Sequence, residues 1–120
     1  MRGASLLPAP DDRFDGILKL RTEDGTFQLF LVERRSYLEK ASTNAIVALA
    51  QFLKRKGHAL LLLARYIPRP TGERLAAADV NFVDSVGNIH LALGKKFART
   101  ILGRPEGQRD TAPLVTAAQV

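Results

Sequence analysis

The sequence predicts one α/β domain, of the α+β kind, in which two helices pack on a mixed central sheet. Three observations predict it: a β-hairpin near the N-terminus, a long amphipathic segment behind it, and an almost unbroken apolar run behind that. The chain has 120 residues, of which 46% are hydrophobic, so it can bury one modest core. We expect an extended lead-in over residues 1–12, the domain over 13–104 and a flexible tail over 105–120.

The hairpin consists of two apolar stretches, residues 14–21 and 26–35, joined by Glu23-Asp24-Gly25. A three-residue loop that ends in glycine suits a type I turn closed by a left-handed residue. Such a turn places Thr22 opposite Thr26 and so fixes the pairing of the two strands.

Ser36 and Glu39 have the spacing of a capping box, which predicts a helix over residues 37–56. Apolar side chains at helical spacing follow, and Gly57 is a natural end for that helix. The apolar run at residues 59–66 predicts a central strand that is covered on both faces and reached by a right-handed crossover. A short helix and three short strands are expected at residues 71–78, 80–84, 89–93 and 97–102.

The balance of charges predicts a polyanionic partner. Lys and Arg outnumber Asp and Glu by 18 to 12, which gives a net charge of +6 and favours nucleic acid as the partner. The alternative is a basic rim that is simply solvated. The candidate nucleic-acid-binding side chains are Arg34, Arg35, Lys95, Lys96, Arg99 and Arg104.

Composition also indicates the compartment. The chain has no cysteine, which fits a reducing cytoplasm. Its longest apolar run is far shorter than the ~20 residues that span a bilayer, and the N-terminal residues do not have the pattern of a signal peptide. We therefore expect a cytoplasmic protein with no membrane partner.

One place on the hairpin gathers groups that could perform chemistry. With Thr22 opposite Thr26, Asp15 falls directly opposite Glu33, and Arg35 projects from the same face. Two carboxylates can hold Mg²⁺ against a phosphate, so Asp15 and Glu33 are the candidate metal ligands. Together with Arg35 they are the candidate catalytic residues. The alternative is a solvated strand end with a surface ion pair.

A second polar cluster is predicted around Gly87, where Asp84, Asn88 and His90 lie close in the sequence. The alternative is that Asp84 and Asn88 hydrogen-bond to the backbone of their own turn, as such residues commonly do. With two histidines and no cysteine, a zinc site is not expected.

Four segments of the chain carry a family resemblance: residues 6–10, 31–35 and 61–75, and above all the turn within residues 80–88, Asp84-Ser85-Val86-Gly87-Asn88. The chain resembles the nuclease-like domain of the abortive-infection AbiEi-like antitoxins of bacterial type IV toxin–antitoxin systems. The resemblance implies a restriction-endonuclease-like fold, whose signature is an aspartate followed by Glu-x-Lys. Arg35 stands in the place of that lysine, and arginine keeps the charge but cannot act as a base.

The family's winged helix-turn-helix is not recognisable in this sequence, nor is the first helix that precedes the nuclease-like core. We therefore expect a non-catalytic nuclease-like binding domain with an antitoxin-type or DNA-associated regulatory role. The alternatives are an active Mg²⁺-dependent nuclease and a dimeric protein-interaction module. No cofactor is expected unless the site is an active nuclease, in which case it uses Mg²⁺. Without the first helix, apolar surface is left uncovered, so a homodimer is expected.

Overall fold

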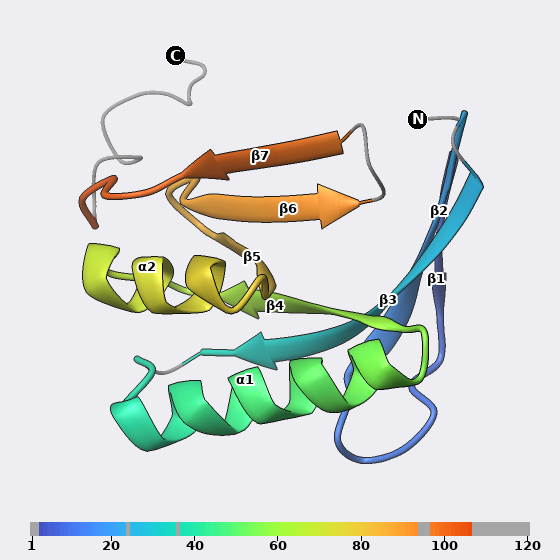
Figure 1. Ribbon diagram of the computed structural model, residues 1–120, viewed down its shortest axis with the longest axis horizontal. Coiled ribbons are helices and arrows are strands. Elements are labelled where there is room, and N and C mark those ends of the chain that lie inside the picture. The colour runs from blue at the N-terminus through green and yellow to red at the C-terminus, as the bar shows by residue number, and fades with distance from the viewer. Residues whose placement is uncertain (1–2, 24, 36, 94–96, 107–120) are drawn as a thin grey trace.

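The computed structural model describes residues 3–23, 25–35, 37–93 and 97–106. It is a mixed α/β fold with a seven-stranded sheet and two helices (Figure 1). In chain order the elements are β1 Gly3–Leu7, β2 Gly16–Thr22, β3 Gly25–Arg34, α1 Lys40–Arg55, β4 Ala59–Ala64, α2 Arg69–Ala77, β5 Asn81–Asp84, β6 Ile89–Leu93 and β7 Phe97–Ile101.

The strands lie in the sheet in the order in which they occur in the chain. β1, β2 and β3 form an antiparallel meander, β3, β4 and β5 are parallel to one another, and β6 and β7 return antiparallel. Each parallel step is crossed by one helix, α1 between β3 and β4 and α2 between β4 and β5. Successive right-handed crossovers in one direction place both helices on the same face of the sheet. Side chains of both helices pack in one apolar cluster, as expected for helices on one face, and Figure 1 shows α1 beside β3 and α2 beside β4.

Two apolar clusters fill the two faces of the sheet. The first joins the helices to the sheet and includes Ile46 and Leu75 from the helices and Leu62 and Phe82 from the strands. The second contains strand side chains, and its buried members are Leu20, Leu29, Leu31, Leu61 and Leu93. β4 contributes to both clusters, which confirms the prediction that the apolar run is a central strand covered on both faces.

The N-terminal segment differs from the expected lead-in, because Gly3–Leu7 forms the edge strand β1. It pairs with β2 along its whole length, with Gly3 opposite Arg21 and Leu7 opposite Ile17. Pro8 follows at once, and a proline has no amide hydrogen with which to continue the ladder. The sheet therefore begins before the hairpin that the alternating pattern predicts.

The hairpin exists, but the predicted pairing of its strands is wrong by one residue. Thr22 pairs with Gly25 and not with Thr26, so Gly16 lies opposite Leu31. Gly25 has a positive φ of 125°, a conformation open to glycine, and this allows β3 to begin at the residue that was assigned to the turn. A slip of one residue changes which side chains face each other along both strands.

The helix begins three residues later than the capping-box spacing predicts. Its N-cap is Glu39, in an extended conformation and without a side-chain cap, while Ser36 lies outside the described residues. The residues before the helix make tertiary contacts: Leu38 packs against the first apolar cluster, and the Tyr37 hydroxyl donates to Glu106. These contacts replace the first turn that local sequence alone favours.

Among the described residues, the apolar side chains of the second cluster are buried or partly buried, and none of them is fully exposed. In this part of the chain, large apolar side chains are exposed at three positions, Leu6, Leu7 and Tyr37, and five leucines of the second cluster are buried. The homodimer therefore stays a prediction; β1 is the exposed edge at which a second chain could pair. Within the described part of the chain, neither helix is long and apolar enough to cross a membrane.

Candidate functional site

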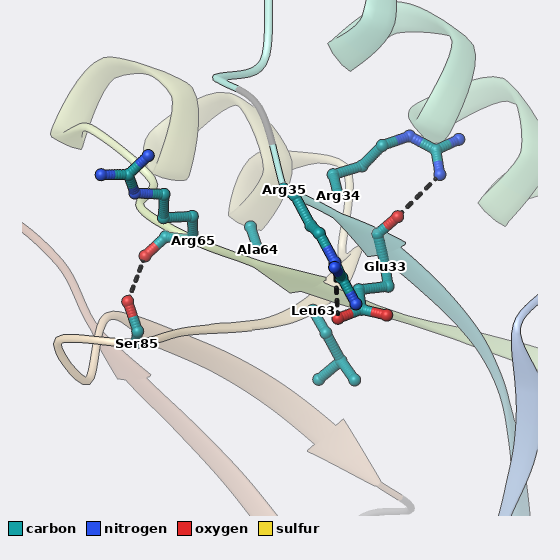
Figure 2. A pocket seen from close by; sticks show the side chains of 7 residues that line it. All are labelled: Glu33, Arg34, Arg35, Leu63, Ala64, Arg65 and Ser85. Carbon is teal, nitrogen blue, oxygen red and sulfur yellow. Dashed lines mark hydrogen bonds and ion pairs between the residues drawn. The ribbon is translucent and has the colours of Figure 1, made fainter.

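The three parallel strands end side by side, and the candidate site lies at their carboxyl ends. Arg34 of β3, Ala64 of β4 and Asp84 of β5 are aligned across the sheet. Ligands of open α/β sheets commonly bind outside the carboxyl ends of parallel strands. A hollow of about 570 Å³ lies there, which we call the carboxyl-end hollow (Figure 2); its lining residues are Glu33, Arg34, Arg35, Leu63, Ala64, Arg65 and Ser85.

The charge around the hollow is predominantly positive, with three arginines and one glutamate. The Arg35 Nε lies 3.7 Å from Glu33 Oε2, and the Arg34 guanidinium donates to the Glu33 carbonyl at 2.9 Å. Arg35 and Arg65 have side chains that are 89% and 64% exposed, so water screens their ion pairs and both guanidinium groups can reach a ligand. The arrangement can bind an anion.

Backbone hydrogen bonds join β3 and β4 at their carboxyl ends. The amide of Arg65 donates to the carbonyl of Arg34 at 3.3 Å, which continues the parallel ladder to the last residue. The Ser85 hydroxyl and amide both donate to the Arg65 carbonyl, so the residue after β5 is tied to the residue after β4. Figure 2 shows Arg65 and Ser85 on one side of the hollow and Arg35 over Glu33 on the other.

The structure brings the candidate catalytic residues Asp15, Glu33 and Arg35 together at the end of β3, but not in the predicted arrangement. Because of the changed register, Asp15 is not paired across the hairpin with Glu33. Instead its carboxylate accepts a hydrogen bond from the backbone amide of Glu33 at 2.7 Å. Glu33 and Arg35 do lie on one side, as their ion pair shows.

These residues do not fit a Mg²⁺ site well. The Asp15 carboxylate faces a backbone donor and the Glu33 carboxylate faces a guanidinium, so a metal would have to displace both internal partners. Among the described residues, no group of three or more His, Cys, Asp or Glu side chains could hold a metal ion. We therefore derive no metal-dependent step from Asp15 and Glu33.

A tyrosine and a glutamate lie next to the hollow. The Tyr37 hydroxyl lies 2.6 and 2.5 Å from the two carboxylate oxygens of Glu106. This hydrogen bond, with burial and the charge of Glu106 adding to it, raises the pKa of Tyr37 above its usual value. The Arg65 guanidinium lies 5.9 Å from the centre of the Tyr37 ring and 4.0 Å from a Glu106 oxygen.

The predicted cluster of Asp84, Asn88 and His90 separates into two unrelated groups. Asp84 is 5% exposed and accepts hydrogen bonds from the amides of Ile67, Val86 and Asn88 and from the Asn88 side chain, at 2.7–3.0 Å. Asn88 is fully buried, and its Oδ1 accepts from the Arg104 amide at 2.7 Å. Asp84 and Asn88 therefore stabilise their own turn, which was the alternative interpretation. They also bind the backbone amides of Ile67, just before α2, and of Arg104, after β7.

His90 lies away from that pair. Its Nε2 lies 2.9 Å from Asp79 Oδ1 and its Nδ1 lies 2.7 Å from the Thr100 hydroxyl. Asp79 is also 3.8 Å from the Lys54 ammonium, and the His90 ring stacks on Phe82. These contacts connect the ends of both helices to β6 and β7, a structural role remote from the carboxyl-end hollow.

The described candidate basic residues lie on or after two strands, β3 and β7. Arg34 and Arg35 line the hollow, whereas Arg99 is exposed on β7 opposite Leu91. Arg104 packs over the turn at Gly87, where its Nη1 lies 2.9 Å from the place of a Cβ atom. Lys95 and Lys96 lie outside the described residues.

Three residues at the site were not predicted: Arg65, Tyr37 and Glu106. Arg65 directly follows the central strand, so aligning the ends of the parallel strands could have found it. Tyr37 and Glu106 are 69 residues apart, and no local pattern relates them.

The chain was compared with protein-family models, with curated proteins and with solved structures, and none of these comparisons gives a match.

Proposed function

We propose that this chain is a nuclease-like domain, of restriction-endonuclease-like fold, that binds nucleic-acid phosphates in the carboxyl-end hollow without cleaving them. The observation that carries the proposal is the presence of three arginines and one glutamate around a hollow at the ends of parallel strands. Guanidinium groups bind phosphate oxygens through paired hydrogen bonds, which suits them to this partner. The family resemblance supports an antitoxin-type or DNA-associated regulatory role.

The order of elements also supports this fold. An antiparallel meander, a crossover helix and a parallel strand follow each other, with an aspartate just before β2 and Glu-x-Arg where β3 ends. The arginine favours binding over catalysis, because a guanidinium does not give up its proton at ordinary pH. The net charge of +6 supports attraction of a polyanion over the whole surface.

Replacing Arg35 or Arg65 with glutamine is expected to weaken binding to duplex DNA in low salt by about three- to tenfold. Each variant should also lower the slope of log K against log salt by ~1, the loss of one phosphate contact. Fluorescence anisotropy with a labelled 20-base-pair duplex at several salt concentrations measures both quantities. Wild type should bind weakly, without sequence preference, and with a steep salt dependence.

Arg55→Gln is the matched control. It removes the same charge from the last turn of α1. This turn lies near the start of β4, at the other end of the strand from the hollow. If Arg55→Gln weakens binding as much as the other two variants, then general charge and not the hollow binds DNA. Affinity that ignores salt points to a protein partner instead.

The alternative of an active nuclease is favoured by one observation, the meeting of Asp15, Glu33 and Arg35 at one strand end. We expect no cleavage of plasmid DNA by the purified protein with Mg²⁺ or Mn²⁺, because both carboxylates have internal partners and Arg35 cannot act as a base. Gel electrophoresis of supercoiled plasmid after long incubation checks this. Nicking that disappears in Glu33→Ala would establish the nuclease and refute the non-catalytic function.

A further inference from the structure

Beside the carboxyl-end hollow, Tyr37 and Arg65 contact a carboxylate of the protein's own chain, that of Glu106. Glu106 follows β7 and returns across the sheet to the segment before α1, where its carboxylate contacts Tyr37 and Arg65. A hydroxyl donor and a guanidinium together are a donor set that also suits a phosphate. The Arg65 side chain belongs to this contact and to the lining of the hollow.

We propose that Tyr37 and Arg65 form a phosphate-binding position at the rim of the hollow, which Glu106 occupies in the free protein. The proposal rests on the proposed function, since it adds a second phosphate contact to the same surface. The phosphate of a bound nucleic acid displaces the Glu106 carboxylate and takes over the Tyr37 hydroxyl and the Arg65 guanidinium. Glu106 is therefore an internal competitor of the ligand.

The exposure of these groups makes the exchange feasible. The Tyr37 residue is 54% exposed, and the Glu106 and Arg65 side chains are 40% and 64% exposed, so Glu106 can leave without opening the core. The chain two residues before Glu106 is anchored, because the Arg104 amide donates to the buried side chain of Asn88. This anchor keeps Glu106 close to Tyr37 and lets the carboxylate return when the ligand leaves.

The magnitude of the competition follows from that exposure. An exposed ion pair changes an equilibrium constant by a factor of about five or less. Glu106→Gln keeps the size of the side chain and removes its charge. This variant is expected to bind the 20-base-pair duplex about two- to fivefold more tightly than wild type at low salt.

Glu23→Gln is the matched control, because it removes the same charge from the exposed turn at the other end of β3. It should change the affinity much less than Glu106→Gln. A second comparison tests the role of Tyr37: if its hydroxyl contacts the phosphate, most of the gain from Glu106→Gln is lost in the double variant Tyr37→Phe/Glu106→Gln. Equal affinities of Glu106→Gln and Glu23→Gln, or a gain that is intact in the double variant, would overturn the proposal.

The contact itself has a readout that does not depend on DNA. Glu106 raises the pKa of Tyr37, so Glu106→Gln should lower the pKa of Tyr37 towards its ordinary value. The chain has two tyrosines, and ultraviolet titration in a Tyr66→Phe background isolates Tyr37. A Tyr37 pKa that does not respond to Glu106→Gln also overturns the proposal.

If neither wild type nor Glu106→Gln binds DNA, both the proposed function and this inference fail. If both proteins bind DNA equally well, the proposed function stands and this inference alone fails.

Discussion

Replacing Asp84 with alanine is expected to lower the free energy of unfolding by about 3–5 kcal/mol, because it leaves several buried donors without a partner. The carboxylate accepts from three backbone amides, and it also accepts from the Asn88 side chain. Asp84 is 5% exposed, so water cannot replace these bonds without opening the structure. A domain of this size has a total stability of about 5–15 kcal/mol, so the variant should lose a large part of its stability.

Urea denaturation followed by circular dichroism measures the change. Asp12→Ala is the control: Asp12 is exposed in the loop between β1 and β2, and its loss should change stability by less than about 0.5 kcal/mol. Asp84→Asn keeps the shape of the side chain but replaces one accepting oxygen with a donating amide group. The loss of stability should therefore lie between those of Asp12→Ala and Asp84→Ala. A loss below about 1 kcal/mol in Asp84→Ala would show that the turn is held by other contacts.

The order and type of most elements could be predicted, because each depends on local patterns of apolar residues. The predicted short strand at residues 89–93 coincides with β6, and the central strand and both helices lie within two or three residues of their predicted bounds. The run at β4 is informative for a physical reason. Leu61 packs in the second apolar cluster and Leu62 in the first, so both faces of the strand require apolar side chains.

The turn residues alone predict the wrong hairpin register, whereas the pairing of apolar side chains along the two strands favours the observed one. Thr22–Gly25 pairing places Leu20 opposite Phe27 and Lys19 opposite Gln28, so that like side chains face each other. Thr22–Thr26 pairing would place Leu20 opposite Gln28 and Lys19 opposite Leu29. The difference has a large consequence at the site. It changes Asp15 from a partner across the strand to an acceptor for the Glu33 amide.

The first residue of α1 and the full set of site residues could not be predicted from the sequence, for a different reason. Both depend on contacts between distant parts of the chain, such as the bond between Tyr37 and Glu106. A capping-box pattern describes what a helix end favours when nothing else contacts it. Here the tertiary contacts of Tyr37 and Leu38 outweigh that local preference.

The second large effect is expected at Phe82, which is fully buried in β5 at the centre of the first apolar cluster. Phe82→Ala should lower the free energy of unfolding by about 3–5 kcal/mol, since it removes a whole ring and leaves a cavity. The surroundings cannot easily collapse into that space. The ring stacks on His90, and α2 approaches it so closely that a Cβ atom at Gly72 would lie 3.5 Å from the end of the ring.

Phe27→Ala provides the matched comparison for this cavity, because it is the same substitution at a partly buried position on β3 in the second apolar cluster. Its cost should be about half as large or less, since a partly exposed site loses less burial and can fill with water. Phe82→Leu should cost about 1–2 kcal/mol, because most of the volume is retained. In chemical denaturation, Phe82→Ala should be the least stable of the three variants. Phe82→Leu and Phe27→Ala should both have stabilities between that of Phe82→Ala and that of wild type. If Phe27→Ala cost as much as Phe82→Ala, the strand-only face of the sheet would contribute as much stability as the helix-covered face, contrary to the burial of these two rings.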